Sequence, residues 1–141
     1  MTRVVLDTNV FVSSLLTRTG SPSRLLDLWR GGRYLLVTCP GIVDEIRANL
    51  ESPRIQAKYA VSPEDIGQLV ALLHQDAMMV PGLSNVGGTI PEDPKDEMIL
   101  ACALDAEADL IVSGDHHLLD LGQFRGIPVV TIREFLTRVG E

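Results

Sequence analysis

The stretch PKDEMILACALDA, residues 94–106, and the segment LIVSGD, residues 110–115, decide the fold of this chain. The first segment is apolar on nearly all sides from Met98 to Leu104, which is typical of a buried helix. The second begins with the continuous apolar run Leu110–Val112, which is typical of a central strand buried on both faces of a sheet. The pattern therefore predicts that this helix and this strand lie at the heart of the domain.

Short apolar segments alternate with helical segments along the rest of the chain, which predicts βαβ units, an α/β fold class and a mostly parallel sheet. Further strands are expected at Val4–Leu6, Tyr34–Thr38, Ala77–Val80 and Pro128–Thr131. Helices are expected over Val10–Leu16, from Ser21 to Trp29, from Pro40 to Leu50, over Glu64–His74, over Lys95–Ala106 and over Ile132–Val139. Thr8 or Asn9 is expected near the cap of the first helix. The 141 residues fit a single domain, residues 1–141, without internal repeats.

The composition predicts a cytoplasmic globular protein. Hydrophobic residues make up 45% of the chain, yet no apolar run approaches the ~20 residues of a membrane span. The N-terminus enters its first strand at Val4, which leaves too little for a signal peptide. Cys39 and Cys102 lack the spacing of metal ligands, so we expect reduced structural thiols.

The charge balance limits how the chain could bind nucleic acid. There are 12 Lys and Arg residues against 19 Asp and Glu residues, a net charge of −7. This balance counts against a protein that grips nucleic acid over a broad surface, because phosphate binding normally requires a basic face. It does not exclude an enzyme whose metal ions meet the phosphate.

Four acidic residues, distant in sequence, are predicted to converge on one rim of the sheet. Open parallel sheets bind ligands at the carboxyl ends of their strands, and helix N-termini gather at the same edge. Asp7 ends the first strand, and Asp115 follows the strand Leu110–Val112. Asp96 lies in the first turn of its helix, and Glu45 lies about one turn into another helix.

Helical periodicity supports an inward direction for Asp96. At ~100° per residue, Asp96 shares a side with Ile99 and Cys102, whereas Glu97 points the opposite way. An inward acid needs a partner because an unpaired buried charge is costly, and a metal ion would supply one. Periodicity alone does not decide between Glu45 and its neighbour Asp44.

Clustered carboxylates without histidine or cysteine select hard cations such as Mg²⁺ or Mn²⁺. Two such ions ~3.5–4 Å apart can clamp the attacking and leaving oxygens of a phosphodiester. The chain contains no Ser-His-Asp order, Gly-rich phosphate loop or reactive Cys–His pairing that would indicate another chemistry. Metal-assisted hydrolysis is therefore the favoured reaction class.

These motifs resemble those of the PIN-domain family over essentially the whole chain. The family's pattern is matched by Asp7-Thr8-Asn9, Glu45, Asp93-Pro94-Lys95-Asp96, and Ser113-Gly114-Asp115 followed by Leu118-Leu119. The closer likeness, which includes the ending Thr131–Leu136, is to the prokaryotic VapC-like toxins of toxin–antitoxin pairs. The order and strand context of the motifs together carry this resemblance.

The resemblance implies a three-layer α/β/α sandwich around a mostly parallel sheet. It also implies an endoribonuclease that hydrolyses RNA with Mg²⁺ or Mn²⁺, often as a homodimer, and a possible antitoxin partner. The residues that match the family's catalytic metal-site acids are Asp7, Glu45, Asp96 and Asp115. Asn9 and Ser113 resemble residues that orient ligands or water, and Asp93 resembles an extra acid whose role stays open.

Simpler roles exist for the same residues. Asp7 could cap a helix, Asp96 could complement a helix dipole, and Asp115 could be a turn residue. His116 and His117 fit a loop or helix start better than metal binding. Among rival functions, a signalling receiver lacks its acidic pair and late lysine, and an aspartate phosphatase lacks an acid at Asn9. A non-catalytic RNA- or protein-interaction module is the alternative.

Overall fold

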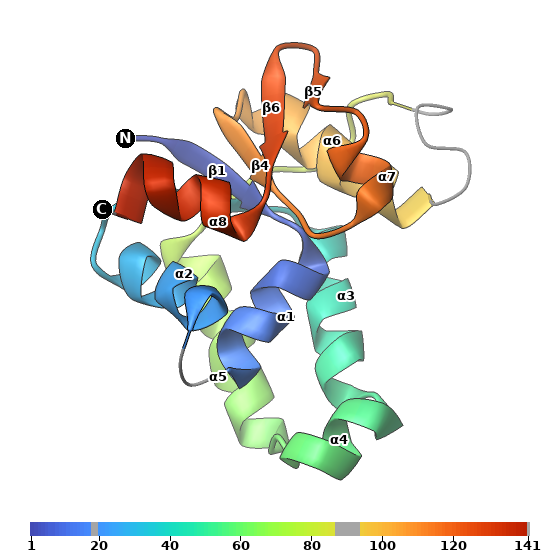
Figure 1. Ribbon diagram of the computed structural model, residues 1–141. Coiled ribbons are helices and arrows are strands. Elements are labelled where there is room, and N and C mark those ends of the chain that lie inside the picture. The colour runs from blue at the N-terminus through green and yellow to red at the C-terminus, as the bar shows by residue number, and fades with distance from the viewer. Residues whose placement is uncertain (18–19, 87–93, 141) are drawn as a thin grey trace.

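A sheet of six strands runs through the middle of the molecule (Figure 1). The structure, a computed structural model, describes residues 1–17, 20–86 and 94–140. The strand order is β3-β2-β1-β4-β6-β5, and every pairing is parallel except that of β5 with β6. The strands are β1 (Arg3–Leu6), β2 (Leu35–Thr38), β3 (Met78–Met79), β4 (Leu110–Val112), β5 (Gln123–Phe124) and β6 (Ile127–Val130).

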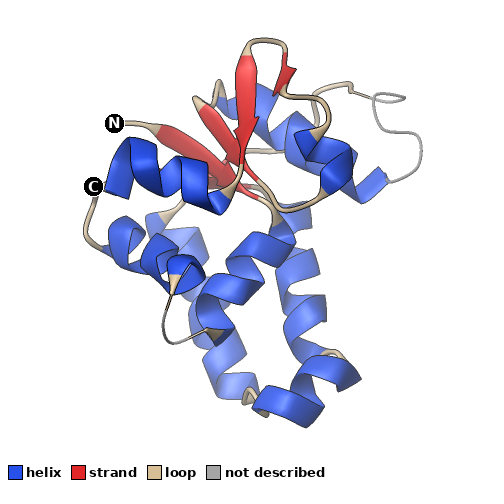
Figure 2. Ribbon diagram, viewed as in Figure 1, coloured by secondary structure: helices blue, strands red, loops and turns tan. Residues whose placement is uncertain are grey.

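Helices cover both faces of this sheet (Figure 2). They are α1 (Thr8–Leu16), α2 (Ser21–Arg30), α3 (Pro40–Glu51), α4 (Pro53–Tyr59), α5 (Pro63–Asp76), α6 (Pro94–Ala106), α7 (His116–Leu119) and α8 (Ile132–Phe135), which a π-helix (Leu136–Gly140) continues. Helix α6 packs on β1 and β2, whereas α2 packs against both α1 and α8. The predicted three-layer α/β/α architecture is confirmed. Among the described residues, no helix has the length and apolar character needed to cross a membrane.

The direction in which successive strands are added to the sheet reverses between β1 and β4. From β1 it moves through β2 to the edge strand β3, and α6 then carries it back to β4 on the other side of β1. Ligands of open α/β sheets bind at such a topological switch point, outside the carboxyl ends of the strands. The register pairs Leu6 with Val112, so the next residues, Asp7 and Ser113, leave the sheet side by side.

The core is centred on α6 and β4, as predicted. Every residue of β4 is buried, and so are the five consecutive α6 residues from Ile99 to Ala103. Such all-round burial explains why this helix lacks a polar face. Cys39 and Cys102 are both buried, and neither forms a disulfide. Tyr34 packs edge-on against Phe135, and burial raises its pKa well above the ordinary value.

Element boundaries differ from the sequence prediction where a single side chain or turn decides them. Helix α1 begins at Thr8, not Val10, because the Asp7 carboxylate accepts a hydrogen bond from the Asn9 backbone N–H and caps the helix. The cap residue is Asp7, so Thr8 and Asn9, which were expected near the cap, are the first two residues of the helix. The β5–β6 hairpin was not predicted, because its two-residue turn is Arg125-Gly126 and not the usual Asn-Gly. Both turn residues have positive φ, 49° and 86°.

Gly82 and Gly67 provide a matched test of the packing between the end of β3 and α3. Gly82 has a φ of +70°, and a Cβ there would lie 2.8 Å from the Cys39 sulfur. We expect Gly82→Ala to lower the free energy of unfolding by about 1–3 kcal/mol, because it adds backbone strain and a clash. Gly67, exposed within α5 with no neighbour in the space of a Cβ, should instead gain ~0.5–1 kcal/mol on Gly67→Ala. Urea denaturation measures both values, and equal effects would contradict the packing at Gly82.

Candidate metal centre

Asp7, Ser113 and Asp115 are joined by hydrogen bonds across the switch point. The Ser113 hydroxyl, which is fully buried, donates to Asp7 Oδ2 at 2.7 Å. The same hydroxyl accepts a hydrogen bond from the Asp115 backbone N–H at 2.9 Å. Ser113 thus fixes both acids relative to the paired strands β1 and β4, as the parallel register requires.

Each of these two acids also caps a helix. Asp7 Oδ1 accepts from the Asn9 N–H at 3.1 Å, and Asp115 Oδ1 accepts from the His117 N–H at 2.8 Å at the start of α7. The capping role considered for Asp7 from the sequence is therefore real, and Asp115, which the sequence suggested could be a turn residue, caps α7. Capping does not compete with ligation, because each carboxylate oxygen has more than one lone pair.

A pocket of about 220 Å³ is lined by Asp7 and Asp115 at this edge of the sheet. The four acids that the sequence placed on one rim all line it, each from a different element or loop. Its lining consists of Asp7, Thr8, Asn9, Glu45, Asn49, Lys95, Asp96, Ile99 and Asp115. We call this the acidic pocket. Asp44, by contrast, is exposed, so the structure brings Glu45 and not Asp44 to the pocket.

Burial of the acids creates a charge problem. Asp7 is only 5% exposed and Asp96 only 6% exposed, and Glu45 and Asp115 are partly buried. Carboxylates that share a buried site repel one another and lose hydration, so their ionised forms require a nearby positive charge. The repulsion among these carboxylates lowers the free energy of unfolding of the metal-free protein, and a bound cation would offset it.

The lining of the pocket fits a hydrated divalent cation. Its charged donors are carboxylate oxygens, the ligands that Mg²⁺ and Mn²⁺ prefer. Thr8 adds a buried hydroxyl oxygen that has no hydrogen-bond partner among the residues the structure describes. Buried polar groups are normally satisfied, often by ordered water, and a metal-bound water in the pocket would satisfy this one.

Three further polar residues at the site were not assigned to it from the sequence. Asn49 lies one helical turn after Glu45 on α3, and this i, i+4 spacing was the available signal. Lys95 precedes Asp96 and supplies a positive charge at the rim. His117 lies near the acids through its ring: its Nδ1 is 3.7 Å from Asp115 Oδ1 and 3.8 Å from Asp96 Oδ2.

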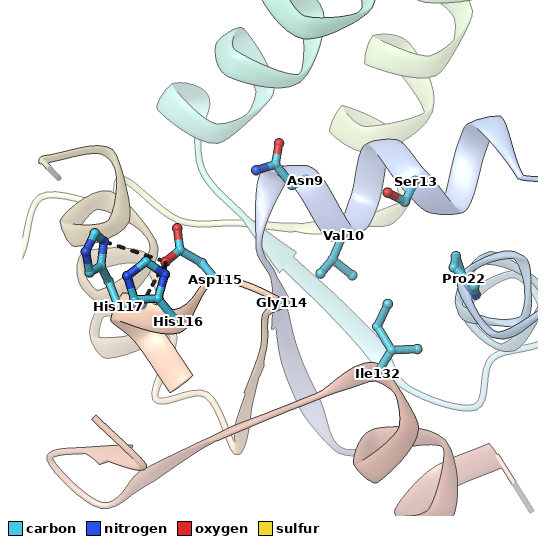
Figure 3. A pocket seen from close by; sticks show the side chains of 9 residues that line it. All are labelled: Asn9, Val10, Ser13, Pro22, Gly114, Asp115, His116, His117 and Ile132. Carbon is cyan, nitrogen blue, oxygen red and sulfur yellow. Dashed lines mark hydrogen bonds and ion pairs between the residues drawn. The ribbon is translucent and has the colours of Figure 1, made fainter. Parts of the chain in front are cut away.

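A larger hollow of about 530 Å³ lies beside the acidic pocket (Figure 3). Asp115, His116 and His117 stand on one side of it, and Asn9 and Ser13 project from α1 on another. Asn9 and Asp115 line both cavities. The predicted supporting residue Asn9 therefore lies between the two. The predicted supporting residue Asp93 lies outside the described residues.

Comparisons with known proteins agree with this architecture. The sequence profile of the PIN domain matches residues 3–117. An uncharacterized protein of Methanocaldococcus jannaschii is 29% identical over 119 residues, which cover 84% of this chain and 74% of that protein.

Two solved structures share the fold. The crystal structure of VapBC2 from Rickettsia felis, bound to a DNA fragment from their promoter, matches with a TM-score of 0.59 at 12% identity. The crystal structure of FitAcB from Neisseria gonorrhoeae matches with a TM-score of 0.54 at 17% identity. Each match covers 92% of this chain and 98% of the other.

Ser113 is the residue to change in order to test how the acids are held. We expect Ser113→Ala to lower the free energy of unfolding by about 1–3 kcal/mol, because it removes a buried partner of both Asp7 and Asp115. Urea denaturation without added metal measures this loss. The control is Ser13→Ala, an exposed site on α1 that should change stability by less than ~0.5 kcal/mol. Equal stability of the two variants would mean that Ser113 does not hold the acids.

Proposed function

This chain belongs to the PIN domain family, and we propose that it is a divalent-metal-dependent endoribonuclease that hydrolyses RNA phosphodiester bonds. The observation that carries the proposal is that Asp7, Glu45, Asp96 and Asp115 line one pocket at the switch point of the sheet. PIN domains are generally nucleases, and clustered carboxylates are the groups that metal-assisted hydrolysis requires.

In this proposal the four acids hold Mg²⁺ or Mn²⁺. Asp7 and Asp96 contribute from the buried floor of the pocket, and Glu45 and Asp115 contribute from its more open side. Ser113 keeps Asp7 oriented through its hydroxyl, and Asn9 presents a polar side chain toward the substrate side. When bound, the metal would activate water and stabilise charge on the leaving oxygen. The protein then needs no nucleophile of its own.

A groove next to the acidic pocket carries positively charged side chains, although the net charge of the whole chain is −7. A hollow of about 410 Å³ between α1 and α4 is lined by Asn9, Val12, Ser13, Leu16, Thr17, Arg54, Ile55, Lys58 and Tyr59. We call it the basic groove. Arg54 and Lys58 can neutralise backbone phosphates, and the partly exposed Tyr59 ring offers a stacking surface. Asn9 lines both cavities, so the basic groove and the acidic pocket adjoin at this residue. In this proposal a single strand held in the groove runs past Asn9 to the acids.

We further propose that the protein acts in the cytoplasm as the toxin of a toxin–antitoxin pair. The VapC-like sequence motifs and the fold shared with VapBC2 and FitAcB support an antitoxin partner. Homodimerisation is proposed on the same resemblance. The alternative, a non-catalytic interaction module, would retain the fold and lose the metal chemistry.

The decisive experiment compares cleavage of a panel of single-stranded RNAs by the wild type, Asp96→Asn and Glu97→Gln. Reactions contain Mg²⁺, Mn²⁺ or a chelator. Loss of residues that only orient a ligand typically costs 10–100-fold, so we expect Asp96→Asn to reduce the cleavage rate at least about 100-fold. Glu97, the neighbouring acid that does not line the pocket, should be replaceable with little effect.

The outcome separates the two functions. Metal-dependent cuts that disappear in Asp96→Asn and persist in Glu97→Gln support the endoribonuclease. If no RNA is cut and divalent metal leaves the melting temperature unchanged, the interaction module is the better description. Melting curves of both variants without metal exclude simple unfolding as the cause of inactivity.

The basic groove has its own test in RNA binding. Measurements use the Asp96→Asn background so that the RNA stays intact. We expect Arg54→Gln and Lys58→Gln to weaken binding and to reduce the slope of log affinity against log salt by roughly 0.7 for each phosphate that is no longer neutralised. Arg30→Gln, an exposed arginine on α2 that does not line the groove, is the control. Equal effects at all three positions would remove the groove from the proposed RNA path.

A further inference from the structure

His117 is tied to the acidic pocket by its own backbone. Helix α7 begins at His116, and Asp115 caps it by accepting the His117 N–H at 2.8 Å. The residue therefore cannot move away from Asp115 without breaking the cap. Its side chain is 34% exposed, so the ring borders the pocket and still reaches solvent.

The distances around the His117 ring match those between ligands of one metal ion. Nδ1 is 3.7 Å from Asp115 Oδ1 and 3.8 Å from Asp96 Oδ2, and the candidate ligand atoms of the three residues all lie within 4.8 Å of one another. Both Nδ1 distances exceed the ~3.2 Å limit of a good hydrogen bond. Ligands that each lie ~2.1 Å from an ion are themselves ~3–4.2 Å apart. The two Nδ1 distances, 3.7 and 3.8 Å, therefore fall in the range expected if this ring and each acid ligated the same cation.

His116 does not share this position. Its side chain is 77% exposed, its Nδ1 lies 4.0 Å from Asp115 Oδ1, and it is not part of the three-residue group. The two imidazole rings contact each other, with centroids 4.1 Å apart. Because His116 is adjacent in sequence but lies outside this group, a substitution at His116 is a control for the same substitution at His117.

We infer that His117 is a nitrogen ligand of the metal ion bound by Asp96 and Asp115, and that it makes the site prefer a first-row transition cation over Mg²⁺. The inference rests on the proposed function only in using the same acids as metal ligands. Sequence reasoning favoured hard cations because the acids lay in motifs without histidine. An imidazole changes that choice, because Mg²⁺ takes oxygen ligands and imidazole suits the borderline transition metals.

Pulsed electron paramagnetic resonance of bound Mn²⁺ tests this inference directly, because it detects ¹⁴N nuclei that ligate the ion. The samples are the untagged full chain, His117→Gln and His116→Gln, each loaded with Mn²⁺ in the absence of RNA. The chain has only three histidines, so an imidazole signal has few possible sources. We expect imidazole ¹⁴N modulation in the wild type and in His116→Gln, and its loss in His117→Gln.

Affinity provides a second measurement. Titration calorimetry should show Mn²⁺ binding weakened about 10–100-fold in His117→Gln, with the Mg²⁺ affinity changed far less. His116→Gln should match the wild type for both ions. Circular dichroism melts of the metal-free variants show whether each still folds.

Several results would overturn the inference. Bound Mn²⁺ without imidazole modulation in the wild type would mean ligation by oxygen alone, and modulation that survives in His117→Gln would assign the nitrogen elsewhere. Absence of any Mn²⁺ binding would also reject it. Because none of these measurements involves RNA, they separate the inference from the proposed function. Mn²⁺ ligated by oxygen alone in a chain that still cuts RNA would reject only the role of His117.

Discussion

The parallel pairing of β1 with β4 is the constraint on which the rest of the structure depends. It is made at the switch point, with Leu6 opposite Val112, and it delivers Asp7 and Ser113 to the same edge at the same level. A shift of one residue would turn the side chains to opposite faces of the sheet. Directly after the paired residues, the Ser113 hydroxyl donates a hydrogen bond to Asp7 and holds the two strand ends together. Glu45 on α3 and Asp96 on α6 line the pocket at the same edge of the sheet.

The acids at the switch point serve the fold and the site together. Asp7 and Asp115 each cap a helix, so their carboxylates are oriented before any ligand arrives. Preorganised donors bind an ion without a further ordering cost. The same arrangement gathers four carboxylates in one partly buried pocket, where a bound cation would offset their mutual repulsion. Rigid caps and clustered carboxylates together suit the metal site that we propose.

The sequence predicted the parts of the structure that depend on periodicity and strand order. Buried α6 and β4, and the acids at strand ends and helix starts, follow from apolar runs and from the geometry of parallel sheets. The hairpin turn at Arg125-Gly126 was missed because arginine rarely takes a positive φ, so no turn signal was present. His117 was judged a helix-start residue, which it is, but the approach of Asp96 on α6 to its ring is a tertiary contact that local sequence does not encode. The role of Asp93 and the functions of the four acids stay predictions.

The Ser113–Asp7 hydrogen bond joins residues 106 positions apart in the chain, and this separation has a consequence for synthesis. On the ribosome, β1 emerges first and can pair with β2 as soon as residues near Leu35 have followed. The other edge of β1 stays open until β4 has been translated, because that edge belongs to β4. The acidic pocket therefore cannot form on a nascent chain until Asp115 has been translated. Its assembly must follow the synthesis of both β1 and β4, whereas the β1–β2 pair needs only the first part of this sequence.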